Sequence, residues 1–278
     1  MRHMPYVGIN IGAVTVKVVS LDRDQVDVRV VRHQGRPLQV VRRLVRDFPA
    51  GAFFGVSGLF GHVSEVAATE AALEYVDGRF DAMASLGGEA FVVYLLEGAR
   101  VLGVLSHNRC AAGSGEFFVQ QIGRLGLDMD AAIDRSFEGK AVPLASRCSV
   151  HCKSDITHKL NRQEASTEDI LRALHDSMAD KVVSLLEKGQ RRVNRLLAVG
   201  GVAQNRAMIA SLQEKLPHTQ VVVLPESPYF EALGTALLTR AAPVHDSPNL
   251  AAGTPLGTLP GLAQYEDRVT LAQASDSG

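Results

Sequence analysis

Glycine-rich turns follow apolar, strand-like runs at three places in this chain. Gly12 follows YVGINI, Gly87 and Gly88 follow FDAMASL, and Gly200 and Gly201 follow RLLAV. A glycine turn after a strand exposes backbone N–H groups that can hold a phosphate, because no Cβ blocks close approach. The pattern predicts an α/β chain that binds a nucleotide, although each turn taken alone also fits a plain hairpin or a strand–turn–helix.

The periodicity of the apolar residues predicts the other elements. A hairpin is expected over 6–22, and further strands and helices are expected as follows: strands at 26–31, 52–57, 80–86, 91–96, 101–106, 195–199 and 220–224, and helices at 37–47, 65–75, 131–136 and 167–190. The strand-rich first half and helical second half favour two lobes of one α/β type around a nucleotide.

These elements divide the chain into three predicted parts. Residues 1–80 form a first lobe that the helix 228–241 closes, and residues 81–227 form a second lobe that carries the cysteines. In the remaining segment, 243–278, the composition changes to Pro, Gly, Ala and Ser, which is typical of a linker or tail.

All three cysteines lie between Ser106 and Asn161. Cys110 precedes AAGSGEFFVQQIGRL and Cys148 precedes SVHCKSDITHKLNRQ, two runs with a helical pattern. The positive end of a helix favours the thiolate, which is the form that binds metal or attacks. The alternative interpretation is that these cysteines are small buried hydrophobic residues.

Composition excludes several classes of protein. The chain has 278 residues, 46% of them hydrophobic, and a net charge of −1, so a nucleic-acid or membrane-surface partner is not indicated. An odd number of cysteines argues against a disulfide framework and for a reducing compartment. The start MRHMPYVGINIG lacks a signal-peptide pattern, and no apolar run reaches membrane-spanning length. We therefore expect a cytoplasmic protein.

Three motifs carry a family resemblance, which extends from about Gly8 to Leu238. NRCAAGSGEFF, SRCSVHCKSD and GGVAQN resemble motifs of the 2-hydroxyacyl-CoA dehydratase activators and benzoyl-CoA reductase ATPases. The resemblance implies a two-lobed, actin-like ATPase fold with two ribonuclease-H-like lobes around a nucleotide cleft. It also implies ATP or ADP, Mg²⁺ and a [4Fe–4S] cluster as cofactors, with Cys110 and Cys148 as the cluster ligands.

The same resemblance assigns the nucleotide site. It implies cofactor-binding roles for Asn10, Gly12, Ala13, Lys17, Gly87, Gly88, Gly113, Gly115, Gly200, Gly201, Gln204 and Asn205. Three acids of the family pattern are replaced, by Asn10, Ser85 and Ala90, which weakens the expected Mg²⁺ positioning. Glu89 is the one carboxylate left in the second loop, and we assign it as the candidate catalytic residue.

A cluster of this kind normally needs four thiolates, so Cys110 and Cys148 from two chains predict a homodimer bridged by one cluster. Cys152 has no counterpart in the family pattern and is expected to tune the cluster, replace a ligand or be buried. A zinc site made by Cys148, Cys152, His151 and His158 is a rival interpretation, although its spacing matches no standard zinc template.

Two functions remain open at this point. The resemblance implies an activator that couples ATP to low-potential electron transfer, from a donor such as ferredoxin or flavodoxin to a partner acyl-CoA dehydratase or reductase. The replaced acids instead favour a nucleotide- and cluster-binding regulatory module with little ATP turnover. A small-molecule kinase on the same fold is a third interpretation, but it would not need paired cysteines.

Overall fold

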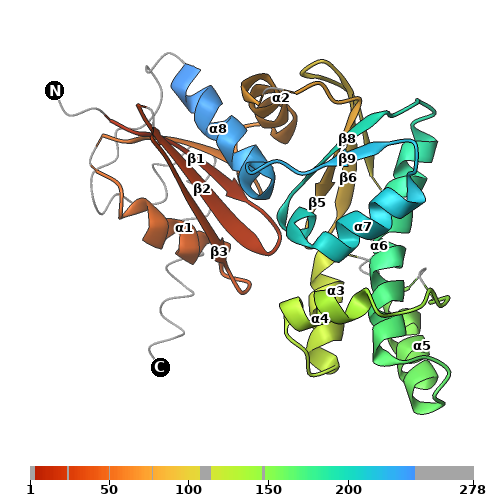
Figure 1. Ribbon diagram of the computed structural model, residues 1–278. Helices are drawn as coiled ribbons and strands as arrows, with labels where there is room; N and C mark the ends of the chain where they lie inside the picture. Colours follow the sequence, from red (N-terminus) through yellow and green to blue (C-terminus); the bar gives the residue numbers. More distant parts are fainter. Residues whose placement is uncertain are drawn as a thin grey trace, which may run out of the picture. The chain divides into compact units, whose positions relative to one another are not determined.

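Two compact units make up the chain, each built on one mixed β-sheet (Figure 1). The structure, a computed structural model, describes residues 4–23, 25–49, 51–76, 78–106, 114–145 and 148–241. The first unit comprises residues 1–78 and 229–278, and the second comprises residues 79–228. The segment proposed as a linker or tail, 243–278, lies outside the described residues.

The sheet of the first unit has the strand order β3-β2-β1-β4. Its strands are β1 (Tyr6–Ile11), β2 (Thr15–Asp22), β3 (Gln25–Arg32) and β4 (Phe53–Gly58). The first three strands pair antiparallel, whereas β4 pairs in parallel with β1. The predicted hairpin with its turn at Gly12 is confirmed.

Helices cover both faces of this sheet. On one face, α1 (Pro37–Val45) packs through Leu38, Val41 and Leu44 against the apolar residues of β1 and β2. On the other face lie α2 (Glu65–Tyr75) and α8 (Phe230–Ala241) (Figure 1). The chain thus returns to its first unit through α8. The apolar side of this helix covers Val19 and Leu21 of β2.

Glycine allows α8 to approach its neighbours at backbone distance. A Cβ on Gly8 of β1 would overlap the backbone of α8 at Ala232 and Ala236. A Cβ on Gly234 would overlap the carbonyl oxygen of Ala68 in α2. Gly234 therefore has no room for a side chain between α8 and α2.

The sheet of the second unit has the order β7-β6-β5-β8-β9. Its strands are β5 (Ala82–Leu86), β6 (Phe91–Glu97), β7 (Arg100–Ser106), β8 (Arg195–Val199) and β9 (Gln220–Val222). As in the first unit, three consecutive strands pair antiparallel and the next strand pairs in parallel with the first of them. The first four strands of each unit therefore share one topology, and the second unit adds β9, although no sequence repeat is visible.

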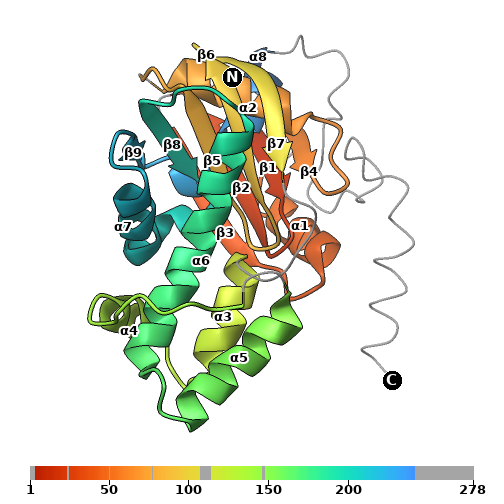
Figure 2. The same cartoon turned by 90° about the vertical axis from the view of Figure 1, so that its right-hand side faces the viewer.

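The second unit carries most of the helices, which gather at one end and along one face of its sheet (Figure 2). Its core joins the sheet to α6 and α7 and continues into α3 and α5. The helical elements are α3 (Gly115–Arg124), α4 (Met129–Ser136), α5 (Ser149–Asn161), α6 (Thr167–Lys188), η1 (Gly201–Gln204), α7 (Arg206–Lys215) and η2 (Ser227–Tyr229).

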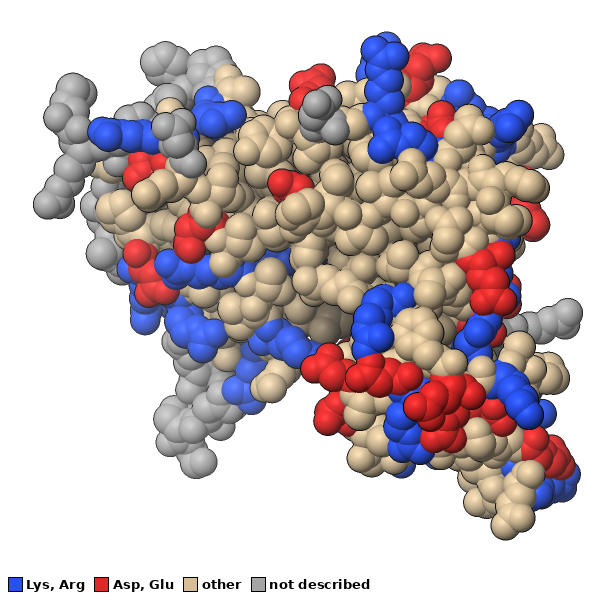
Figure 3. All heavy atoms as spheres, viewed as in Figure 1, with Lys and Arg blue, Asp and Glu red and all other residues tan. Residues whose placement is uncertain are grey.

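Charges of both signs alternate over the helical end of this unit (Figure 3). Arg135 pairs with Glu168 at 2.5 Å, and Arg206 pairs with Asp134. Pairs that are exposed or only partly buried, such as these, add little stability because water and salt screen them. Among the described residues, no helix is both long enough and apolar enough to cross a membrane.

Replacing Gly234 tests the close approach of α8 to α2. We expect Gly234→Ala to lower the free energy of unfolding by about 1–3 kcal/mol or more, because the new methyl group meets backbone that cannot move aside. Chemical denaturation measures the change. Gly123→Ala in α3 is the matched control: its Cβ would meet nothing within 4 Å, so helix propensity predicts a neutral or stabilising effect. Equal effects of the two substitutions would contradict the packing argument.

Candidate functional site

The turn between β1 and β2 lies at the carboxyl end of β1 in the first unit. The N–H of Gly12 donates to the carbonyl oxygen of Thr15 at 2.9 Å, which closes the hairpin around Ala13. Ligands of α/β proteins are usually bound beyond the carboxyl ends of parallel strands, and β1 pairs in parallel with β4. The position of this turn therefore suits the predicted phosphate contact.

Charged side chains surround Asn10, next to this turn. Asn10 lies directly opposite Lys17 in the β1–β2 register. The ammonium of Lys17 is 3.7 Å from a carboxylate oxygen of Glu231, and the two side chains are only 12% and 8% exposed. Asn10 also hydrogen-bonds the side chain of Glu65, the first residue of α2. One lysine and two glutamates therefore surround the position where the family resemblance implies an acid.

The pKa of Glu65 is raised by this environment. Loss of solvation has the largest effect, and the negative charge of Glu231 adds to it. The hydrogen bond from Asn10 and the charge of Lys17 lower the pKa, but by less. A carboxyl group that keeps its proton nearer to neutral pH is suited to acid–base chemistry.

A buried polar network connects Asn10 to α8. The amide of Asn10 donates to the hydroxyl of Ser57 at 3.2 Å. Thr235 Oγ1 lies 2.7 Å from both Ser57 Oγ and the carbonyl oxygen of Glu231. Because Asn10, Ser57 and Thr235 are buried, these hydrogen bonds fix the spacing of β1, β4 and α8 around the charged residues.

The second glycine turn connects β5 to β6 and supports the start of α3. The N–H of Gly87 donates to the carbonyl oxygen of Ala90 at 3.1 Å. In the other direction, the carbonyl oxygens of Gly87 and Gly88 accept from the N–H groups of Gly115 and Glu116, at 3.4 and 2.8 Å. The turn and the helix that follows Cys110 are thus one hydrogen-bonded assembly.

Two of the assigned residues at this turn have clear environments. A Cβ on Gly115 would lie 2.5 Å from Val202 Cγ2, so this position has no room for a side chain. Glu89 is exposed, which leaves its carboxylate accessible to a ligand. Ser85 lies in β5 and Ala90 directly before β6.

The third glycine turn follows β8. Gly200 has a φ of +91°, and a Cβ there would lie 2.6 Å from the carbonyl oxygen of Leu86 in β5. Gly201 and Gln204 are both exposed, and a Cβ on Gly201 would meet nothing within 4 Å. Gly200 therefore shapes the turn, whereas Gly201 and Gln204 leave open space where a ligand can approach.

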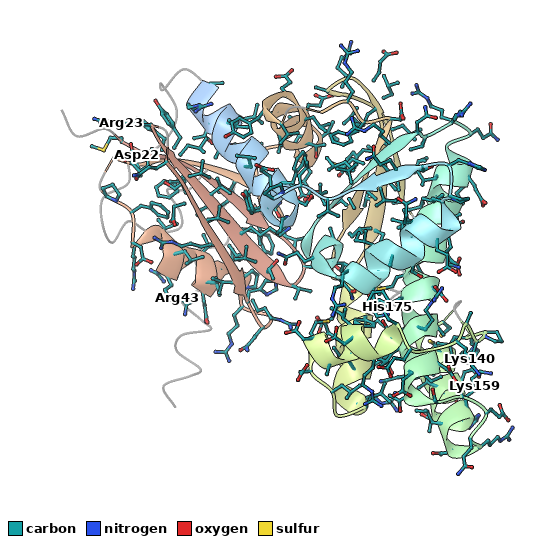
Figure 4. All side chains as sticks on the ribbon, in the orientation of Figure 1. Asp22, Arg23, Arg43, Lys140, Lys159 and His175 are labelled. Carbon is teal, nitrogen blue, oxygen red and sulfur yellow. The ribbon has the colours of Figure 1, made fainter. Side chains whose placement is uncertain are left out.

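Asn205 has a structural role within the protein. Its side-chain oxygen accepts from the N–H groups of Ala207 and Met208, which caps α7, and its amide donates to His175 Nε2 at 2.9 Å. His175 lies on α6 facing this turn (Figure 4), and its Nδ1–H donates to the carbonyl oxygen of Leu171 at 2.8 Å. Burial lowers the pKa of His175 to about 4, so the ring is neutral and can accept from Asn205.

The two described cysteines have opposite environments. Cys148 is the N-cap residue of α5, and the nearby N–H groups of His151 and Val150 lower its pKa. Cys152, one turn later, is 2% exposed within the core, and burial raises its pKa to about 11. The predicted thiolate at the start of this helix is therefore supported for Cys148, and Cys152 is the buried hydrophobic residue of the alternative interpretation.

The zinc interpretation receives no support. Within the described parts of the chain, no three His, Cys, Asp or Glu side chains lie close enough together to hold a metal ion. The proposed zinc ligands Cys148, Cys152, His151 and His158 all belong to the described parts. Cys110 and Gly113, which the sequence analysis assigned to the cluster and the nucleotide, lie outside the described residues.

Alkylation distinguishes the two thiols. In metal-free protein we expect iodoacetamide to modify Cys148 with a half-maximal rate at a pH below that of an ordinary thiol, because a lowered pKa leaves more thiolate at any given pH. Cys152 should stay unmodified near neutral pH. Peptide-resolved mass spectrometry measures both rates. The unfolded chain is the control, in which both cysteines should react alike; equal rates in the folded protein would contradict the assignment.

The sequence analysis missed four residues near the first turn. Glu65 and Glu231 carry the local negative charge, His33 bonds the turn itself, and Gly58 ends β4 with a φ of +78°. Among these four residues, only Gly58 had a local signal in the sequence: it lies in the run SGLFG, which resembles the other glycine turns. Nothing in the sequence near Glu231 indicates that it lies beside Lys17.

Comparison with known proteins identifies relatives. The model of the BadF/BadG/BcrA/BcrD ATPase family matches residues 21–239. The 2-hydroxyisocaproyl-CoA dehydratase activator of Clostridioides difficile is 28% identical over 63% of this chain and 65% of its own length. The (R)-2-hydroxyglutaryl-CoA dehydratase activating ATPase of Acidaminococcus fermentans is 29% identical over 55% of this chain and 58% of its own length. The matched segments thus span somewhat less than two thirds of these relatives.

A solved structure confirms the fold. The activator of the 2-hydroxyisocaproyl-CoA dehydratase from Clostridium difficile, with bound ADPNP, superposes with a TM-score of 0.74 at 23% sequence identity. The likeness covers 85% of this chain and 94% of that one. The mixed α/β, actin-like ATPase fold predicted from the sequence is confirmed.

Proposed function

This chain belongs to the BadF/BadG/BcrA/BcrD ATPase family, and we propose that it is an activator that couples ATP to electron transfer toward an acyl-CoA dehydratase or reductase. Cys148 is the observation that carries this proposal. It is a helix N-cap whose pKa the adjacent N–H groups lower, as a cluster ligand requires. A nucleotide-binding module alone would not need this thiolate.

The proposed first cofactor is a [4Fe–4S] cluster shared between two copies of the chain. Cys148 and Cys110 from each copy would supply the four thiolates, and the positive end of α5 would favour the anionic cluster. Cys152 takes no part, because it lies in the core with its proton retained. When bound, such a cluster supplies one-electron chemistry, and the chain's own contribution is to hold it.

Adenine nucleotide is the proposed second ligand. In the first unit, the glycine turn after β1 is the proposed phosphate contact. In the second unit, the turn after β5 is a proposed phosphate contact, and the turn after β8 would receive the adenosine through Gly201 and the exposed Gln204. The activator from Clostridium difficile was solved with bound ADPNP, which supports a nucleotide of this kind here. The structure suggests that Asn205 contributes by capping α7 and that Lys17 contributes by charge.

Mg²⁺ would find carboxylates at the first turn in spite of Asn10. Glu65 and Glu231 lie in the same cluster as Asn10, and an oxygen-rich set of this kind suits the cation. Lys17 lies among them and offsets part of their charge. We propose two carboxylates as candidates for a role in hydrolysis: Glu65 in the first unit, and Glu89 in the second unit, which was assigned from the sequence.

A partner enzyme and an electron donor complete the proposed role. The relatives from Clostridioides difficile and Acidaminococcus fermentans are named as activators of acyl-CoA dehydratases, and we extend this to a dehydratase or reductase partner here. A ferredoxin or flavodoxin would supply the electrons. The alternative function is a nucleotide- and cluster-binding regulatory module, which the neutral residues Asn10, Ser85 and Ala90 favour.

Iron content tests the cluster. Protein purified without oxygen should contain about two iron atoms and as much acid-labile sulfide per chain, since one cluster serves two chains. We expect Cys110→Ser and Cys148→Ser each to lose most of the iron and the visible absorbance. Cys152→Ala is the matched control and should keep both. Full iron in the two serine variants, or its loss in Cys152→Ala, would contradict the ligand assignment.

Phosphate release separates the activator from the regulatory module. We expect ATP turnover to be slower than about 1 s⁻¹. Positioning and electrostatics supply most of the catalysis in phosphoryl transfer, and Asn10, Ser85 and Ala90 replace three acids that would contribute to both. Glu65→Gln should lower the rate about 10-fold or more, since general acid–base catalysis is usually worth at least that much. Glu89→Gln should have a smaller effect, because its exposed carboxylate is not held in place. Binding of ATP without measurable turnover would favour the regulatory module.

A further inference from the structure

His33 bonds two carbonyl groups of the first glycine turn, those of Gly12 and Val14. It follows β3, and its ring Nε2 lies 3.1 Å from the carbonyl oxygen of Gly12. Its backbone N–H donates to the carbonyl oxygen of Val14 at 3.1 Å. The side chain is 7% exposed, so these bonds are shielded from water. One residue therefore holds two peptide groups of the turn, Gly12–Ala13 and Val14–Thr15.

The protonation of the ring follows from its partners. Nδ1 accepts from the N–H of Gly35 at 3.2 Å, so the proton is on Nε2, which donates to Gly12. The backbone of His33 is fixed as well, since Arg36 N–H donates to its carbonyl oxygen at 2.7 Å across a turn. Gln34 and Gly35 in this turn have φ values of +47° and +81°. The ring is thus held at both nitrogens and cannot rotate without breaking a buried hydrogen bond.

The orientation of the Gly12 carbonyl has a consequence for ligands. A trans peptide is planar, so the N–H of Ala13 points in the direction opposite to the carbonyl oxygen of Gly12. With that oxygen held toward His33, the N–H of Ala13 faces away from the imidazole. Turns bind anions through N–H groups that are aligned in this way.

We propose that His33 is a positioning residue for phosphate binding: it holds the Gly12–Ala13 peptide with its N–H directed at the phosphate. This inference rests on the proposed nucleotide site and adds a residue to it. His33 itself does not touch the ligand. It acts by removing the freedom of the turn before the phosphate arrives, which lowers the entropy cost of binding.

Calorimetry with two ligands tests the role. His33→Ala should weaken ADP binding about 5-fold, the equivalent of one buried hydrogen bond, and should leave adenosine binding unchanged because adenosine carries no phosphate. His33→Gln keeps a side-chain N–H for Gly12 and should restore ADP binding to within about 2-fold of the wild type. Gln34→Gly, a change at an exposed residue of the neighbouring turn whose φ already suits glycine, is the matched control and should bind ADP normally.

Each result has one meaning. Weaker ADP binding with unchanged adenosine binding, restored by glutamine, supports the role of His33. Equal ADP affinity of His33→Ala and wild type overturns the role of His33 but leaves the proposed nucleotide site intact. An equal loss of affinity for ADP and adenosine also overturns the role of His33, because it indicates a general effect on the fold. Failure of the wild type to bind ADP overturns this inference and the proposed nucleotide site together, whereas a bound cluster would still be detected by its iron.

Discussion

Each unit of this protein depends on one contact between a glycine and a strand end. Gly58 is the last residue of β4 and lies against the carbonyl oxygen of Ile11. Gly200 follows β8 and lies against the carbonyl oxygen of Leu86. Their φ values are +78° and +91°, which cost an ordinary residue roughly 1–2 kcal/mol before any overlap is counted. In each unit, the contact lies where the carboxyl ends of two parallel strands meet, β1 and β4 in the first and β5 and β8 in the second. The glycine turns of a unit therefore lie at one edge of its sheet.

The charges at the first of these edges are distributed differently from the family pattern. Asn10 is neutral, but Glu231 reaches Lys17 from α8 and Glu65 hydrogen-bonds Asn10 from α2. Burying Lys17 without a counter-charge would be costly, so Glu231 stabilises it in place. Other elements of the unit therefore bring negative charge to this edge, and the neutral side chain at Asn10 is a weaker argument against metal binding than the sequence suggests.

Cys148 and Cys152 differ in their expected reactivity although they are only four residues apart in the chain. Cys148 precedes the first turn of α5 and receives its free N–H groups, whereas Cys152 is inside the helix, where those groups are already bonded, and faces the core. The first N–H groups of α3 donate hydrogen bonds to the carbonyl oxygens of Gly87 and Gly88. The strands that flank the second glycine turn and the helices of the cysteine segment share one core.

The sequence by itself determined the elements, their order and the three turns, because glycine tolerance and apolar periodicity act over a few neighbouring residues. It also indicated the thiolate character of Cys148, which depends only on the helix that follows. Tertiary structure alone decided that Glu231 meets Lys17, that His33 bonds Gly12 and that Asn205 bonds His175. The physical reason is the same in each case: these partners are far apart in the chain, and only the packing of helices and strands in the folded units brings them within reach.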